Sequence, residues 1–245
     1  MLVSFFILLG AIFGSFCNVI IYRLPKILEG DTLSLSWPAS HCPDCKQPIK
    51  ARHNIPLLGW LLLRGRCASC GHAILWRYPL VEALLAALYG TIVWQQGVTL
   101  QSCVDLMAVT LLVPLLFIDL QTMLLPDRLT LPLLAFALLF AASGYGTVML
   151  PSALFAAAAG FGIPWLISTL FRLLRGHEGM GRGDMKLLAA LGAWLGPQPL
   201  LDIFVASTLL AIAAALVLLR IKPGEPFPFG PYPIIAALGW LLIMR

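Results

Sequence analysis

The chain has 245 residues, of which 60% are hydrophobic and only 11% are charged, with a net charge of +5. Soluble domains carry roughly 25% charged residues, so this composition excludes a single water-exposed globular domain. A bilayer must solvate most of the chain, and no nucleic-acid partner is predicted.

Apolar stretches in chain order predict an all-α membrane protein of about eight transmembrane helices. The stretches are 2–21, 79–94, 103–118, 129–142, 150–170, 187–201, 203–221 and 229–244. No Lys or Arg precedes Arg23, so the first stretch is predicted to be a retained span and not a cleaved signal. Within it, Gly10 and Gly14 form a small-xxx-small pair that suits close helix packing.

The basic residues predict an orientation. If Met1 lies outside, every one of the 16 Lys and Arg residues except Arg245 falls in an inner loop. The outer connections 95–102, 143–149 and 196–202 carry none. The positive-inside rule therefore predicts that both termini lie outside. In the later inner loops the basic residues are Arg128, Arg172, Arg175, Arg182, Lys186, Arg220 and Lys222.

Three segments are predicted: a first transmembrane helix (1–22), a cytoplasmic insert (23–78) and a seven-helix bundle (79–245). The insert contains two Cys-x-x-Cys pairs, Cys42 with Cys45 and Cys67 with Cys70. Two Cys-x-x-Cys pairs spaced along the chain as these are fit tetrahedral coordination of Zn²⁺ by four thiolates. Gly71 suits a tight turn after the second pair. Disulfides are the alternative, but the insert faces a reducing compartment. Four thiolates leave no open position, so the zinc is predicted to be structural.

Two acidic residues border apolar helices at the predicted inner surface. Asp119 ends the third stretch, and Asp184 opens the sixth in the run Gly181-Arg-Gly183-Asp184-Met-Lys186. Two carboxylates near one water can share a proton and hydrolyse a peptide bond. Acids at such positions also serve transport and ion pairing. Asp184 could instead cap its helix, and Asp127 is interpreted as a cap or a turn residue.

These motifs resemble the type IV prepilin peptidases, a branch of the GxGD membrane aspartic proteases. The resemblance rests on Gly181–Lys186, on Asp119 followed by Leu125-Pro126-Asp127 and Thr130, and on the 65-residue interval between the two aspartates. Further matching runs begin at Gly14, Asn54, Arg77 and Pro228. It implies that Asp119 and Asp184 are catalytic and that Gly181, Gly183 and Lys186 belong to the active-site loop. It also implies cleavage of a basic leader from prepilins or type II secretion pseudopilins, after a glycine, at the cytoplasmic face of a bacterial inner membrane.

The same resemblance implies that the chain also methylates the new amino terminus with S-adenosylmethionine. We hypothesise that Asn18, Arg23, Arg77 and Glu82 bind the methyl donor. Alternatively, these four residues form ion pairs that hold the insert against the bundle.

Two other classes of protein were weighed. A proton-coupled transporter would show buried acids such as Glu82 and Asp105, but the candidate acids gather at one membrane face and no inverted repeat is visible. A non-enzymatic, zinc-bearing assembly factor would tolerate the loss of either aspartate.

Overall fold

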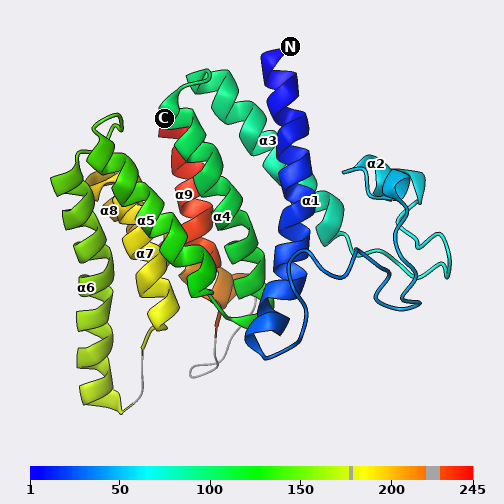
Figure 1. Ribbon diagram of the computed structural model, residues 1–245. Helices are drawn as coiled ribbons and strands as arrows, with labels where there is room; N and C mark the ends of the chain where they lie inside the picture. The colour runs from blue at the N-terminus through cyan, green and yellow to red at the C-terminus, as the bar shows by residue number, and fades with distance from the viewer. Residues whose placement is uncertain (177–178, 219–226, 245) are drawn as a thin grey trace. The chain divides into compact units, whose positions relative to one another are not determined.

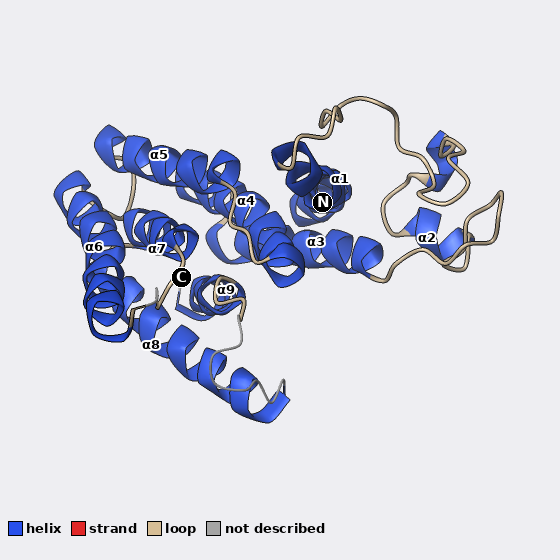
Figure 2. Ribbon diagram, turned by 90° about the horizontal axis from the view of Figure 1, so that it is seen from below, coloured by secondary structure: helices blue, strands red, loops and turns tan. Residues whose placement is uncertain are grey.

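The computed structural model describes residues 1–176, 179–218 and 227–244, and every regular element in those ranges is helical (Figure 2). This confirms the all-α prediction. Three basic residues on which the predicted orientation partly rests, Arg220, Lys222 and Arg245, lie outside the described residues.

The chain divides into two compact units, Met1–Gly97 and Val98–Arg245. The first contains α1 (Leu2–Leu28), the 3₁₀ turn η1 (Ala51–His53), α2 (Leu58–Leu62) and α3 (Arg77–Gln96) (Figure 1). A Cβ added at Gly10 would lie 2.6 Å from Leu85 O, and one added at Gly14 would lie 2.6 Å from Glu82 Cα. The small-xxx-small pair therefore lets the backbones of α1 and α3 touch, as predicted.

The second unit contains α4 (Leu100–Thr122), α5 (Asp127–Ser143), α6 (Leu150–Arg175), α7 (Arg182–Leu195), α8 (Pro197–Ala213), the π-helical continuation η2 (Ala214–Leu218) and α9 (Pro231–Met244). Its most buried helix is α7, which packs against α5, α6 and α8. A Cβ at Gly160 would lie 2.6 Å from Leu188 O, and one at Gly192 would lie 2.6 Å from Ala156 O. These glycines let α6 and α7 pack in backbone contact.

The predicted boundary between the sixth and seventh stretches is wrong. The sequence predicted one stretch through residue 201 and an outer loop at 196–202, whereas α7 ends at Leu195 and α8 begins at Pro197. Gly196 alone makes the turn, with φ of 93°. Glycine accepts this positive φ, and proline is tolerated in the first turn of a helix, where its missing N–H has no partner to lose.

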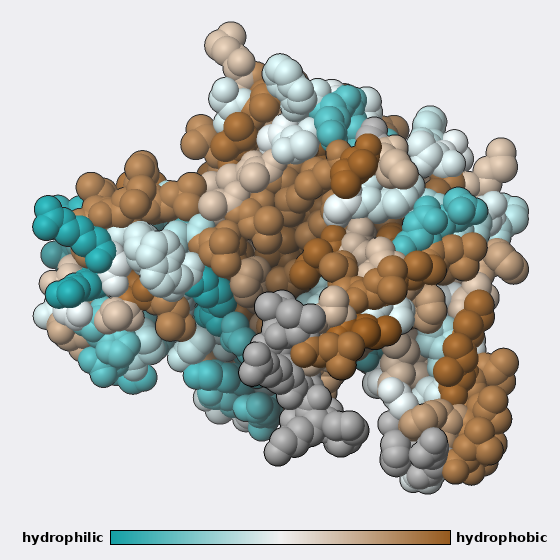
Figure 3. Space-filling view, turned by 180° about the vertical axis from the view of Figure 1, so that it is seen from behind, coloured by the Kyte–Doolittle hydropathy of each residue, from teal (hydrophilic) through white to brown (hydrophobic). Residues whose placement is uncertain are grey.

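Apart from the short α2, the described helices agree in number and order with the eight predicted stretches. Four are long and apolar enough to cross a membrane: α1, α4, α6, and α8 with its continuation to Leu216. Hydrophobic side chains cover much of the face shown in Figure 3. The number of spans beyond these four stays a prediction, as does the three-part division of the chain, although α1 continues to Leu28, past the predicted end at residue 22.

Candidate active site and metal centre

The two predicted catalytic aspartates lie at one end of the second unit. Asp119 is in the last turn of α4, and Asp184 is in the first turn of α7. Met123 ends α4 in the left-handed conformation (φ 55°), and its N–H donates to the carbonyl oxygen of Asp119 at 2.9 Å. The first residues of α5 and α9 lie at this same end, so three helix N-termini adjoin the two acids (Figure 1). Helix dipoles favour negative charge there.

The two carboxyl groups are close enough to interact electrostatically. Asp119 is only 4% exposed. Its Oδ2 and the Oδ1 of Asp184 are both buried, and neither oxygen has a hydrogen-bond partner among the described residues. Buried carboxylate oxygens normally find a partner, because leaving one unpaired costs about 1–3 kcal/mol. A pair of this kind can share a proton and hold a water molecule between its members, as peptide hydrolysis requires.

Glycines bring the backbone against these acids. A Cβ at Gly230, just before α9, would lie 2.8 Å from Asp119 Oδ2, and the backbone of Gly230 hydrogen-bonds to the Asp119 carboxylate. A Cβ at Gly181 would lie 3.1 Å from Asp184 Oδ2, and one at Gly183 would lie 3.0 Å from the Cβ of Leu125. The predicted loop glycines Gly181 and Gly183 thus adjoin the dyad. The role of Gly230 was missed, although the motif that contains it was noticed.

Both capping interpretations need correction. The N-cap of α7 is Gly181, not Asp184, which is the third residue of the helix and whose Oδ2 lies close to Gly181. In a capping box the third helical residue likewise reaches back toward the cap. At α5 the N-cap is Pro126, and Asp127 is the first helical residue, with no side-chain cap bond.

Asp127 instead pairs with Lys186. The ammonium Nζ of Lys186 lies 2.7 Å from Asp127 Oδ1 and 2.8 Å from Oδ2. The pair joins the first residue of α5 to the first turn of α7, two residues beyond Asp184. Lys186 therefore forms its ion pair with Asp127, the third acid at this end of the unit. Asp119 Oδ2 and Asp184 Oδ1, which have no partner among the described residues, remain available for chemistry.

Breaking this ion pair is expected to slow catalysis more than it destabilises the fold. The side chains of Lys186 and Asp127 are 32% and 52% exposed, so the pair contributes about 0–1 kcal/mol to stability. Lys186→Met and Asp127→Asn should each lower kcat by about tenfold, because small displacements of a reacting group are costly. The measurement is kcat and KM for peptide hydrolysis, with Lys186→Arg as the control that keeps the charge. Full activity in Asp127→Asn alone would show that Lys186 does not act through this pair.

At the opposite end of α4 and α7, hydrogen bonds explain why the acidic residue Asp105 can be buried. It is fully buried, and its Oδ1 accepts hydrogen bonds from Gln101 Nε2 and from Trp194 Nε1, each at 3.0 Å. Because α4 and α7 run antiparallel, this bond fastens them at one end while Asp119 and Asp184 approach at the other. Asp105 is thus a fixed member of the core.

In the first unit, the four predicted cysteines form one cluster. Their sulfur atoms all lie within 4.8 Å of one another, with Cys42 and Cys70 at 3.8 Å and Cys45 and Cys67 at 4.0 Å. A tetrahedral zinc with Zn–S bonds of about 2.3 Å requires sulfur–sulfur edges of about 3.8 Å. All six cysteines of the chain are free thiols. The cluster therefore fits the predicted Zn²⁺ and not disulfides.

Each pair sits on a similar turn. The N–H of Cys42 donates to Gln47 O at 3.0 Å, and that of Cys67 donates to His72 O at 2.8 Å. The residue after each second cysteine has a positive φ, 58° at Lys46 and 74° at Gly71. Gly71 fills this position as predicted, whereas Lys46 does so at some cost in strain.

Backbone hydrogen bonds prepare one of these sulfurs to bind a metal. N–H groups of Cys70 and Ser69 lower the pKa of Cys67 to about 6, which favours the thiolate. The pKa of Cys70 is raised to about 12 by desolvation and by the neighbouring thiols, although the His72 N–H acts in the opposite direction. Binding of a divalent cation would displace the protons that remain on these two sulfurs.

Replacing Cys42 and Cys67 by serine is expected to abolish zinc binding, because each knuckle then supplies only one thiolate. Metal analysis of purified protein should find about one Zn²⁺ per chain in the wild type and none in the double variant. A matched variant that replaces the buried Cys17 on α1 should keep its zinc. Disulfides at the four positions would contradict the assignment.

The four residues proposed to bind the methyl donor lie on α1 and α3. Asn18 Nδ2 donates to Tyr78 O at 3.0 Å, and its buried Oδ1 has no partner among the described residues. Arg23 donates to Ser34 O at 2.8 Å and to Pro38 O at 2.6 Å.

Glu82 accepts from Leu57 N–H at 2.7 Å, and the Arg77 guanidinium lies over the Tyr78 ring. Arg23 and Glu82 thus hold the main chain of the insert through hydrogen bonds, whereas the alternative interpretation expected ion pairs. Asn18 is the member of the set whose buried oxygen can still accept a hydrogen bond from a ligand.

Comparisons with known proteins agree with these features. Residues 8–96 match the bacterial peptidase A24 N-terminal domain, and residues 106–216 match the type IV leader peptidase family. The second match contains both aspartates.

Similar proteins from several bacteria carry the name prepilin leader peptidase/N-methyltransferase. One from Neisseria gonorrhoeae is 41% identical over 96% of this chain and 87% of its own length. Another, from Dickeya chrysanthemi, is 44% identical over 96% of this chain and 91% of its own length. One from Klebsiella pneumoniae is 48% identical over 80% of this chain and 86% of its own length. No solved structure matches significantly. The chain belongs to the type IV leader peptidase family.

Proposed function

We propose that this membrane enzyme cleaves the leader from type IV prepilins or type II secretion pseudopilins and then methylates the new amino terminus. The observation that carries the proposal is the Asp119–Asp184 pair, with two buried carboxylate oxygens that have no partner among the described residues. The relatives named for both activities cover nearly the whole chain, which supports the two-step function.

Cleavage follows from two carboxyl groups that share one proton. The ionised aspartate takes a proton from water, and the resulting hydroxide attacks the carbonyl carbon of the scissile peptide. The protonated aspartate donates to the carbonyl oxygen as the tetrahedral intermediate forms. As that intermediate collapses, the aspartate that took the proton from water gives it to the nitrogen, and the other aspartate takes back the proton from the oxygen, so that the C–N bond breaks and the mature protein leaves with a free amine. The hydrogen bond from the Gly230 backbone would keep Asp119 oriented through these steps.

The distribution of charge supports a cytoplasmic active site. Arg128, Arg172, Arg182 and Lys186 all lie at the end of their helices where Asp119 and Asp184 are found. By the positive-inside rule this charge distribution supports an active site at the cytoplasmic face of a bacterial inner membrane, with both termini outside. A substrate could then keep its apolar helix in the bilayer while its basic leader lies beside the acids. Cleavage after a glycine would occur at the edge of that helix.

For the second step we propose that Asn18, Arg23, Arg77 and Glu82 hold S-adenosylmethionine, which supplies an electrophilic methyl group when bound. The unpartnered Oδ1 of Asn18 fits a hydroxyl or ammonium donor of that molecule. Asn18→Leu should weaken binding of the donor, measured by calorimetry, while leader cleavage by the second unit continues. Unchanged donor binding would remove Asn18 from the site.

The function is tested by incubating the purified protein with a prepilin and labelled S-adenosylmethionine, then reading the product by mass spectrometry. A product that lacks its leader establishes the peptidase. An additional methyl group on its amino terminus establishes the transferase. An intact prepilin after incubation with several candidate substrates would overturn the proposal.

A further inference from the structure

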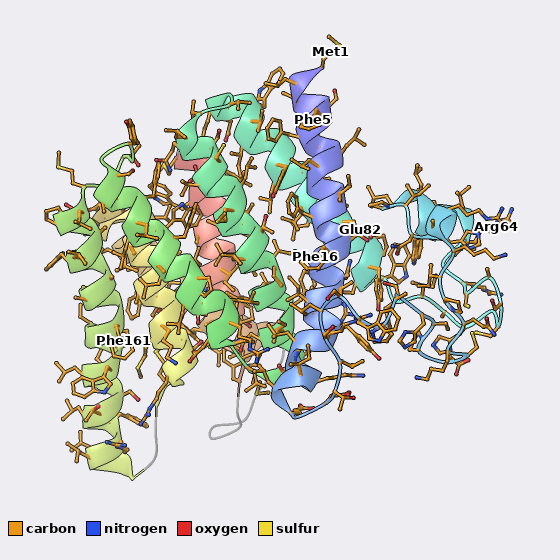
Figure 4. All side chains as sticks on the ribbon, viewed as in Figure 1. Met1, Phe5, Phe16, Arg64, Glu82 and Phe161 are labelled. Atoms are coloured by element: carbon orange, nitrogen blue, oxygen red, sulfur yellow. The ribbon has the colours of Figure 1, made fainter. Side chains whose placement is uncertain are left out.

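Helix α2 of the insert lies beside α3 and not beyond its end. Leu57, the residue before α2, donates its N–H to Glu82 at 2.7 Å. Glu82 is five residues after the first residue of α3, Arg77, which is about 8 Å along the helix axis. Figure 4 shows Glu82 on the part of α3 near the insert, and Arg64 on the segment that follows α2. If α3 enters the membrane, α2 therefore lies at the level of the membrane interface.

One face of α2 is fixed to the insert. Gly59 is buried and packs directly on the carbonyl oxygen of His53. Trp60 donates its Nε1–H to Ile74 O at 3.3 Å, and its ring centroid lies 4.7 Å from that of Trp76. These contacts set which side of the helix faces outward.

The outward face is apolar. Leu58, Leu61 and Leu62 are 55%, 61% and 71% exposed. Their spacing of three and four residues places them on one side of the helix. A small insert surrounded by water would lose stability by leaving three neighbouring leucines uncovered, so this face requires an apolar partner.

Charged and aromatic residues around α2 indicate what that partner is. Arg52, Arg64 and Arg66 flank the helix, and all three are exposed. Trp76, which caps α3, is 74% exposed. Tryptophan is enriched at membrane interfaces, and each basic residue near an anionic leaflet contributes about 1 kcal/mol of attraction.

We propose that α2 is an interfacial helix that binds the anionic surface of the bilayer beside α3. Leu58, Leu61 and Leu62 enter the boundary between headgroups and acyl chains, and the flanking arginines pair with lipid phosphates. A protein partner would leave unexplained why the face lies level with the first turns of α3. This docking goes beyond cleavage and methylation, since neither reaction requires it.

The test places a photoreactive benzoylphenylalanine at Leu61 of the full-length protein in nanodiscs of phosphatidylcholine and phosphatidylglycerol. The matched control carries the same group at Ala68, an exposed residue between Cys67 and Cys70. After irradiation, mass spectrometry should find lipid adducts at position 61 with a yield several-fold above that at position 68. A zinc content of about one ion per chain in both variants confirms that the insert is folded.

Lipid charge gives a second readout. Adduct yield at position 61 should fall when phosphatidylglycerol is omitted, and Arg64→Gln should reduce the yield in nanodiscs that contain it. Equal yields at positions 61 and 68 would overturn the proposal, because the leucine face would then be no nearer lipid than the metal knuckle. Adducts that join position 61 to a second copy of the chain would overturn it in favour of self-association.

Discussion

Replacing Asp119 or Asp184 by asparagine is expected to lower the rate of leader cleavage by about 10²–10⁴-fold, the usual contribution of a general acid or base. Asparagine keeps the shape of the side chain but can neither take a proton from water nor donate one to the carbonyl oxygen as a carboxyl group does. The measurement is the initial rate of leader removal with a prepilin in detergent or nanodiscs. The double variant should be little slower than either single variant, since the two acids act as a unit.

The control is Asp202→Asn, which removes an exposed acid from α8 in the same unit. It should cleave at the wild-type rate. Methylation of a substrate that already lacks its leader should continue in both dyad variants, because the residues proposed for the methyl donor lie in the first unit. A dyad variant that folds and still cleaves at the normal rate would remove that aspartate from the mechanism.

Adding one methyl group next to Asp119 should also be severe. In Gly230→Ala the new Cβ would lie 2.8 Å from Asp119 Oδ2 and 3.0 Å from Leu125 Cδ1, both shorter than ordinary contacts. The carboxylate must move, and a displacement of about 1 Å can cost about 10²-fold in rate. We expect kcat to fall by about that factor while the zinc content of the first unit stays unchanged.

Gly239→Ala is the matched control, because it adds the same methyl group on α9, where no atom of the described residues outside the adjoining turns of that helix lies within 4 Å. Alanine in place of glycine inside a helix is expected to be neutral or slightly stabilising. If Gly230→Ala cleaves as fast as Gly239→Ala, the position of Asp119 does not depend on the close approach of Gly230.

Much of this organisation was predictable because it depends on local patterns. Two Cys-x-x-Cys pairs have few uses other than a tetrahedral metal site, and the sulfur positions agree with that use. Gly10 and Gly14 indicated close packing of two helices, and α1 and α3 do touch there. Asp119 and Asp184 border apolar stretches, where an acid is expensive unless it has a function.

Other features depend on which helices meet in space. The single-residue turn at Gly196 was missed because apolar residues continue on both sides of it, so composition gives no sign of the break. The pairing of Lys186 with Asp127 and the contact of Gly230 with Asp119 each join residues far apart in the chain. Nothing in the local sequence distinguishes Asp127, bound by a lysine, from Asp119, whose Oδ2 is unpaired.

The division after Gly97 has a consequence for how such a gene can change. The two family matches, 8–96 and 106–216, fall on either side of that division, and each compact unit contains one of the proposed activities. A gene that lost its first unit would keep both acids, Lys186 and Gly230, whereas it would lose the thiolate cluster and the residues proposed for the methyl donor. Under the proposed assignment, proteolysis can therefore be inherited without methylation.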